Sequence, residues 1–232
     1  MALGARLFGL SPGKGRIKSN IMERIICLAA GYAFGLIQTG YLYGKLIHKD
    51  IRQYGSGNSG TTNALRVLGK KAGAVVFLGD FLKAVILCLL VRYLYGRTMP
   101  EMAPLLMLYG GFGVVLGHNF PFYLRFKGGK GIAATSGVII TMDWRITLVC
   151  LAAFIISVAV TRIVSIGSLL VVTIFLGMWM GLGLSGLLPL SGDYLAESYV
   201  VVFVFTALAY WRHRANIKRL LDGTENKFGS KK

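Results

Sequence analysis

Long apolar runs separated by short polar segments extend through most of the sequence. Most of them approach the roughly 20 residues that a helix needs to cross a bilayer, and they lack the alternation of a membrane β-strand. The pattern predicts an all-α, polytopic integral membrane protein with seven transmembrane helices. We expect these helices at residues 24–46, 72–95, 104–123, 132–142, 146–160, 164–188 and 199–211. The run at 132–142 is short for the hydrocarbon thickness, so it is expected to begin near the interface or to tilt less than the others.

The polar segments form two sets that alternate between the two sides of such a bundle. Lys and Arg are frequent in the first set, which comprises residues 48–71, 125–131, 161–165 and the tail after 211. The second set carries Glu101, Asp143, Asp193 and Glu197 against Arg97 and Arg145. The positive-inside rule therefore predicts an N-out/C-in orientation, with the first set in the cytoplasm. The basic region 1–23 opposes this orientation, but the rule is a summed bias and four concordant segments outweigh one.

Composition narrows the class further. Hydrophobic residues make up 55% and charged residues 15% of the 232 positions, against about 25% charged residues in soluble domains. The net charge of +17 favours anionic membrane lipids or phosphorylated substrates as partners. No nucleic-acid partner is expected, because the basic residues are scattered between the apolar runs. Cys27, Cys88 and Cys150 lie in apolar runs without CxxC spacing, so neither a disulfide nor a metal site is predicted.

A glycine- and lysine-rich stretch at residues 125–135 interrupts the apolar pattern. Glycine lets the backbone approach a ligand closely and turn its N–H groups inward. A new apolar run follows at once, so those N–H groups are expected at a helix start, where anions are favoured. Lys127, Gly128, Gly129 and Lys130 therefore suggest a phosphate cradle, although no Walker A motif is present. The alternative is a plain basic loop.

Two further polar clusters fall on the same predicted side. In residues 55–66, small hydroxyl and amide side chains stand among glycines, and Thr62 or Asn63 could cap a short helix carrying Arg66. In residues 211–221, His213 and Asn216 would share one helix face. A solvated loop and a basic helix that touches anionic lipid are the respective alternatives.

Four residues within or beside the apolar runs are further candidates. His118 ends the third run, as a base, a phosphate ligand or a helix-terminal hydrogen-bonding residue. Asp80 and Lys83 have i, i+3 spacing and can neutralise each other inside the bundle, either for function or in support of a site. Ser168 follows the start of the sixth run, where its hydroxyl could cap the helix or touch a ligand.

Several catalytic motifs do not occur in the sequence. It contains no Gly-x-Ser-x-Gly elbow, no HExxH metal motif and no acidic metal cluster, so no metal and no cofactor are expected. It also lacks the His-x-x-x-x-Asp of the soluble-motif glycerolipid acyltransferases. From the residues alone, a transporter or channel for a phosphorylated anion is a second possible function, although the sequence shows no internal repeat.

Three motifs together resemble the bacterial acyl-phosphate:glycerol-3-phosphate acyltransferases, the PlsY family. They are Ser56-Gly57-Asn58-x-Gly60-x-Thr62-Asn63-x-x-Arg66; Gly117-His118-x-Phe120-Pro121 with Phe126-Lys127-Gly128-Gly129-Lys130-Gly131; and His213-Arg214-x-Asn216-Ile217 with Gly223-Thr224-Glu225. The resemblance covers residues from about 24 to 228 in the family's order and spacing. Thr61, Gly167 and Ala215 depart from its usual residues.

The resemblance implies a multi-pass enzyme of the bacterial inner membrane with its site facing the cytoplasm. It would transfer a fatty acyl group from acyl phosphate to the 1-hydroxyl of sn-glycerol 3-phosphate, giving lysophosphatidic acid and inorganic phosphate. The residues that it assigns to catalysis are Ser56, Arg66, Lys130 and His213. The residues that it assigns to substrate binding are Asn58, Thr62, Asn63, His118, Lys127, Gly128, Gly129, Ser168 and Asn216.

We accordingly expect a monomer with a basic N-terminal extension (1–23), a membrane-embedded acyltransferase domain (24–228) and a C-terminal tail (229–232). Acyl phosphate carries a good leaving group, so alignment and charge neutralisation are expected to dominate catalysis, with the donor's own phosphate oxygen taking the hydroxyl proton. The competing hypothesis makes His213 or His118 the general base.

Overall fold

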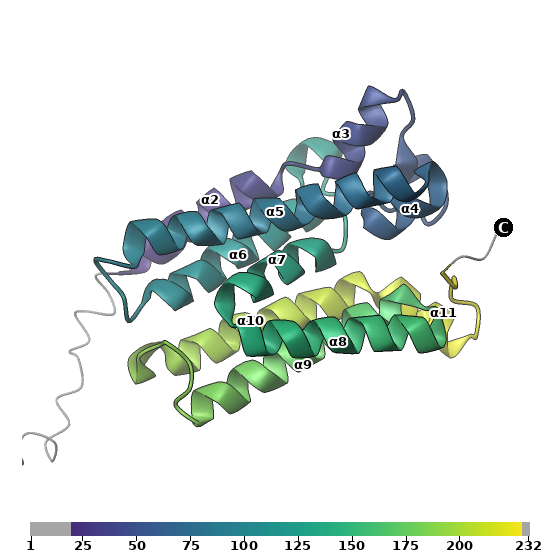
Figure 1. Ribbon diagram of the computed structural model, residues 1–232. Helices are drawn as coiled ribbons and strands as arrows, with labels where there is room; N and C mark the ends of the chain where they lie inside the picture. Colours follow the sequence, from purple (N-terminus) through teal and green to yellow (C-terminus); the bar gives the residue numbers. More distant parts are fainter. Residues whose placement is uncertain (1–19, 229–232) are drawn as a thin grey trace, which may run out of the picture.

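The structure is a computed structural model that describes residues 20–228, and this part of the chain is all helical. Most of the expected extension 1–23 and the tail 229–232 therefore lie outside the described residues. In chain order, Figure 1 shows α2 (Ile21–Gly35), α3 (Thr39–Leu46), η1 (Ile51–Gln53), α4 (Thr61–Leu68), α5 (Lys70–Tyr95), α6 (Ala103–Asn119), η2 (Phe122–Leu124), α7 (Ile132–Met142), α8 (Trp144–Thr161), α9 (Val164–Leu184), α10 (Gly192–Arg212) and α11 (Arg214–Leu221).

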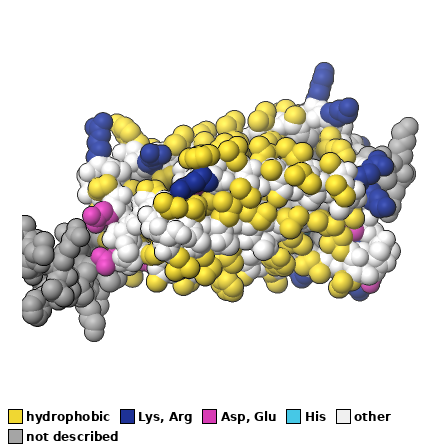
Figure 2. Space-filling model, turned by 60° about the horizontal axis from the view of Figure 1, so that its bottom comes forward, with side chains coloured by type: hydrophobic (Ala, Val, Ile, Leu, Met, Phe, Trp, Pro, Cys, Tyr) yellow, Lys and Arg dark blue, Asp and Glu magenta, His cyan; other side chains and the backbone are white. Residues whose placement is uncertain are grey.

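The described helices confirm the predicted polytopic all-α fold. Six stretches are long and apolar enough to cross a membrane, and α7 is the shorter seventh apolar helix. Hydrophobic side chains cover the flank of the bundle between its two ends (Figure 2). The loops of the basic set lie at the end that carries α4 and α11, and those of the acidic set lie at the opposite end (Figure 1).

Three local predictions were wrong. The first expected helix is broken at residues 36–38 into α2 and α3, with Gln38 before α3 in a non-helical conformation. The last span begins at Gly192, seven residues before its predicted start at 199. Neither Thr62 nor Asn63 caps α4, because Gly60 occupies the N-cap position.

The early start of α10 has an electrostatic explanation. Glu197 lowers the hydropathy of this segment, but its carboxylate accepts hydrogen bonds from Arg24 of α2 at 2.6 and 2.7 Å and from Tyr109 of α6 at 2.7 Å. A charge with such partners inside a bundle is tolerated, whereas hydropathy counts it as unpaired.

Among the described helices, α2 and α6 share the most extensive contact. Glycines from both helices meet at their crossing, so the two backbones are in direct contact. Such small residues replace the hydrophobic driving force that helix association lacks in lipid. This pair holds the break of α2 and the C-terminal end of α6 together beside the cavity described next.

Candidate active site

A cavity of about 550 Å³ opens at the end of the bundle that carries α4 and α11. This volume is typical of a small-molecule site. The cavity brings together residues from all three sequence motifs, which are far apart in the chain. Its polar lining includes Ser56, Asn58, Thr62, Asn63, Arg66, Asp80, His118, Lys130, Ser165, Ser168, His213, Asn216, Arg219 and Glu225.

Lys130 stands directly before the N-terminus of α7. Gly131 adopts φ 84°, a left-handed conformation that favours glycine, and it turns the chain into the helix. The Lys130 ammonium donates to Asn216 Oδ1. Burial lowers the pKa of Lys130 to about 8, since desolvation penalises the charged form, and the nearby carboxylate of Glu225 opposes that shift. The amine and the first turn of α7 thus present positive charge to one part of the cavity.

Glu225 ties the C-terminal segment to the rest of the site. Its two carboxylate oxygens accept from Asn216 Nδ2 at 2.7 Å, from Arg219 Nε at 2.7 Å and from Ser165 Oγ at 3.2 Å. Asn216 Oδ1 accepts a hydrogen bond from Lys130, and Asn216 Nδ2 donates one to Glu225. These two contacts determine the orientation of the Asn216 amide. This network fixes the position of the Lys130 amine.

His213 lies at the junction of α10 and α11 and is 2% exposed. Its Nδ1–H donates to Ala209 O at 2.8 Å, because a carbonyl oxygen can only accept. Burial, reinforced by the nearby Lys130 charge, lowers the pKa of His213 to about 4. The ring is therefore neutral at pH 7, and its Nε2 lone pair is available as an acceptor in the cavity.

The Gly128–Gly129 turn differs from the predicted cradle. Gly128 N donates to Asn119 O and Gly129 N donates to His118 O, at 3.2 and 3.1 Å, so neither N–H is free for a ligand. Both glycine carbonyls accept from Arg212. The prediction that these N–H groups turn inward is wrong, because the turn packs onto the end of α6. Lys127 and Gly128 instead line a second, smaller hollow that Ser56 and Asn58 also border, and Gly129 lines neither hollow.

Asn63 holds the first motif in shape. Its Nδ2 donates to Ile51 O, Tyr54 O and Asn58 O at 2.8–3.1 Å, and its Oδ1 accepts from Ser56 N at 2.9 Å. The amide is thus committed to the loop that carries Ser56 and Asn58. Asn63 borders the cavity, but its hydrogen bonds serve the loop rather than a ligand.

The other predicted site residues that line the cavity differ in whether their polar atoms are already hydrogen-bonded within the protein. Ser168 Oγ donates to Val164 O one turn earlier at 2.9 Å. Asn58 Oδ1 accepts from Gly60 N at 2.8 Å, and Arg66 is exposed on α4. Ser56, Thr62 and His118 complete the predicted set.

Most of the remaining lining is apolar and comes from α5, α7, α8 and α9. Its side chains include Phe77, Phe81, Ile132, Ile139, Ile140, Leu151, Phe154, Ile155 and Val171. Four of them, Phe77, Ile140, Leu151 and Ile155, are at least 40% exposed on the flank. This part of the cavity therefore opens towards the lipid side, whereas the polar part opens at the end of the bundle.

Sequence reasoning left several important residues out of the candidate set. Glu225 was noticed only as part of a motif, although its position as an acid within a basic tail is a usable signal. Arg212 donates to the carbonyl groups of the Gly128–Gly129 turn, but in the sequence nothing distinguishes it from the other basic residues that follow the last span. Gln38 donates to Gly117 O and His118 O across the break of α2, and nothing local in the sequence marks it.

The fold and the cavity define a multi-pass helical membrane protein that can bring a phosphorylated, water-soluble molecule together with a lipid chain. Residues 25–223 match the family model described as glycerol-3-phosphate acyltransferase. The chain belongs to this family and is an integral membrane acyltransferase acting on glycerol 3-phosphate. The alternative function, a transporter or channel, is thereby set aside.

Relatives and solved structures agree with this assignment. The chain is 43% identical to a glycerol-3-phosphate acyltransferase of Clostridioides difficile (strain 630), over 91% of this chain and 98% of the relative. It is 40% identical to that of Thermoanaerobacter pseudethanolicus, over 90% and 98%. It is similar to the crystal structure of PlsY in its glycerol 3-phosphate form, with a TM-score of 0.75 and 33% identity over 89% of this chain and 96% of that chain. The lysophosphatidic acid form gives a TM-score of 0.73 and 32% identity over 89% of this chain and 95% of that chain.

Proposed function

We propose that the acyl donor is a fatty acyl phosphate and that the acceptor is the 1-hydroxyl of sn-glycerol 3-phosphate. The observation that carries this proposal is the two-part cavity, in which an apolar part open to the flank meets a cationic part around Lys130, Arg66 and Arg219. Both substrates are anionic, so these cations offset the repulsion between them. The acyl chain of the donor would occupy the apolar part.

In the proposed reaction, the hydroxyl oxygen of glycerol 3-phosphate forms a bond with the acyl carbon, and the bond from that carbon to the phosphate oxygen breaks. The departing phosphate keeps the electron pair. His213 Nε2, as an acceptor, orients the hydroxyl. With a pKa of about 4, His213 is a weaker base than the departing phosphate, since the second ionisation of a phosphate group has a pKa of about 6 or higher. The proton therefore ends on the donor's phosphate.

The donor is tested with purified protein in detergent micelles. Palmitoyl phosphate is expected to release inorganic phosphate and form lysophosphatidic acid only when glycerol 3-phosphate is present. Palmitoyl-CoA and palmitoyl-acyl carrier protein, offered at the same concentration, are expected to give no product. Turnover with palmitoyl-CoA but none with palmitoyl phosphate would overturn the proposed donor.

We expect kcat/KM for glycerol 3-phosphate to fall as the pH rises above about 8. The pKa of Lys130 is lowered to about 8, so its ammonium charge is present below this pH and is lost above it. Since kcat/KM reports groups of the free enzyme, a pH series at limiting glycerol 3-phosphate measures this ionisation. In Lys130→Arg the guanidinium stays charged, so the alkaline fall is expected to vanish from whatever activity remains; a fall that persists unchanged there assigns it to another group.

The proposal includes location, orientation and assembly. We propose that the enzyme resides in the bacterial inner membrane, N-out/C-in, with the end bearing α4 and α11 in the cytoplasm, in agreement with the basic loops at that end. Residues 24–228 would be the enzymatic domain. The enzyme is proposed to act as a monomer.

A further inference from the structure

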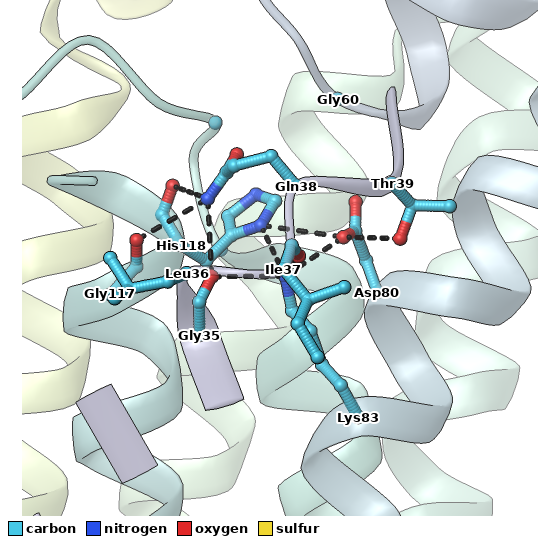
Figure 3. Close-up of polar contacts among 12 residues, drawn as sticks. Gly35, Leu36, Ile37, Gln38, Thr39, Gly60, Asp80, Lys83, Gly117 and His118 are labelled. Atoms are coloured by element: carbon cyan, nitrogen blue, oxygen red, sulfur yellow. Dashed lines mark hydrogen bonds and ion pairs between the residues drawn. The ribbon is translucent and has the colours of Figure 1, made fainter. Parts of the chain in front are cut away.

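A buried polar cluster lies against the wall of the cavity, formed by Asp80 and Lys83 of α5 and His118 of α6 (Figure 3). Asp80 is 1%, Lys83 4% and His118 3% exposed. Asp80 and His118 border the cavity, and Lys83 lies behind them. None of the reaction steps proposed above uses Asp80 or Lys83, so the placement of an ion pair inside an apolar bundle calls for a reason.

Lys83 holds the break between α2 and α3 to His118. Its Nζ lies 2.6 Å from Ile37 O, 2.9 Å from Asp80 Oδ1 and 3.0 Å from His118 Nδ1, with Gly35 O farther away at 3.4 Å. An ammonium has three protons to donate and cannot accept. The buried pair is neutral overall when Asp80 is a carboxylate and Lys83 an ammonium, and in this state the three protons go to the three nearest atoms.

The third of these contacts determines the tautomer of His118. Because Lys83 can only donate, His118 Nδ1 accepts and carries no proton. The imidazole is neutral, since a second positive charge 3.0 Å from the Lys83 ammonium would be repelled. A neutral ring with an unprotonated Nδ1 carries its proton on Nε2.

The Nε2 edge of His118 lies against Gly129, where even a Cβ atom would overlap it. Within residues 20–228, no group accepts a hydrogen bond from Nε2. Since His118 borders the cavity, the acceptor has to be a molecule inside the cavity. His213 has the opposite arrangement, because its proton is on Nδ1 and its Nε2 accepts.

Asp80 would favour the reverse tautomer if Lys83 were absent. Its Oδ1 lies 3.5 Å from His118 Nδ1 and also accepts from Thr39 Oγ1 at 3.1 Å. A carboxylate can only accept, so an imidazole facing Asp80 alone would place its proton on Nδ1. His118 Nε2 would then become an acceptor and would repel an anionic oxygen.

We propose that Lys83 is a positioning residue that fixes His118 in its Nε2–H tautomer, so that His118 donates a hydrogen bond to a phosphate or acyl oxygen of a bound substrate. His118 then serves as a donor and not as the general base. The identity of the accepting oxygen rests on the acyl transfer proposed above, whereas the tautomer does not depend on it.

The tautomer is measured by nitrogen NMR of the full-length protein, labelled with ¹⁵N-histidine, in micelles at pH 7. The His118 signals are assigned by their loss in His118→Asn. We expect a protonated Nε2 and an unprotonated Nδ1 in the wild type, and the reverse in Lys83→Met. Lys71→Met, at an exposed position of the same helix, is the matched control and is expected to leave the tautomer unchanged. A protonated Nδ1 in the wild type, or an unchanged tautomer in Lys83→Met, would overturn the proposal even if activity fell.

Kinetics tests the consequence for the substrate. Loss of a hydrogen bond to a charged group predicts a fall in kcat/KM of about ten- to a hundredfold in Lys83→Met. Should that variant fail to fold, His118→Gln and His118→Asn replace it, because the Gln amide can reach the position of Nε2 whereas the Asn amide reaches that of Nδ1. Higher activity in His118→Gln supports the proposal, and equal or higher activity in His118→Asn contradicts it. If the wild type shows the expected tautomer but no turnover of acyl phosphate, the proposed function fails and the tautomer assignment stands.

Discussion

Replacing Lys130 with alanine is expected to lower kcat/KM about 10²- to 10³-fold. The amine is held at the N-terminus of α7 by Asn216, whose amide is in turn oriented by Glu225. In the proposed acyl transfer, such a donor, already aligned before the substrate arrives, would stabilise the charge that develops on the departing phosphate as its bond to the acyl carbon breaks. Removal of one donor of this kind typically costs two to three orders of magnitude in rate. Steady-state release of phosphate from palmitoyl phosphate, in the presence of glycerol 3-phosphate, measures the loss.

The control for Lys130→Ala is Lys218→Ala. Lys218 is exposed on α11, at the same end of the bundle, and does not line the cavity. The control removes the same charge from the same membrane face and is expected to retain wild-type kinetics. A Lys130→Ala enzyme within threefold of the wild type, with an unchanged melting temperature, would refute the role of charge neutralisation given to Lys130.

The second large effect is expected for stability, from Gly113→Val at the crossing of α2 and α6. A Cβ at Gly113 would overlap Leu28 O and would lie 2.8 Å from Tyr32 N and 2.9 Å from Gly31 Cα. These are backbone atoms of α2 that can move only if the two helices separate. Overpacking within a core usually costs 1–3 kcal/mol, and here we expect roughly 3 kcal/mol or more. The variant should unfold at a much lower temperature or fail to accumulate.

A thiol-reactive fluorophore can follow this unfolding, because Cys27, Cys88 and Cys150 are free and buried. Gly177→Val is the matched control, since Gly177 is exposed on α9 and a Cβ there would meet nothing within 4 Å. We expect the control to melt within a few degrees of the wild type. Equal melting temperatures for the two variants would show that the close approach of α2 and α6 contributes little to stability.

The separation between α2 and α6 also affects the site. Gln38 and Lys83 satisfy carbonyl groups at the break of α2, and both contact residues at the end of α6. A valine side chain at Gly113 should therefore disturb His118 at a lower temperature than the one at which the bundle unfolds. Loss of activity at temperatures where the thiols remain protected would reveal such a step.

The hydropathy and charge of the sequence by themselves determined the fold class, the seven apolar helices and the loops that share one end of the bundle. This works because a bilayer imposes one length on every span and requires each backbone to satisfy its own hydrogen bonds. The residue types of the three motifs indicated a phosphorylated substrate, since small hydroxyls, amides and cations of the type found at Ser56, Asn58 and Lys130 suit one, whereas acyl transfer followed only from the resemblance to a family.

Only the tertiary structure decided what each polar group does. The sequence predicted that the Gly128–Gly129 turn binds a ligand, but its N–H groups donate to carbonyl groups at the end of α6. The side-chain amide of Asn63 likewise forms its hydrogen bonds with its own loop. His118 and His213 look alike in the sequence, yet Lys83 and Ala209 O place their protons on opposite nitrogens. The physical reason is that a side chain's type sets how many hydrogen bonds it can make, whereas the atoms that surround it set which of them remain for a substrate.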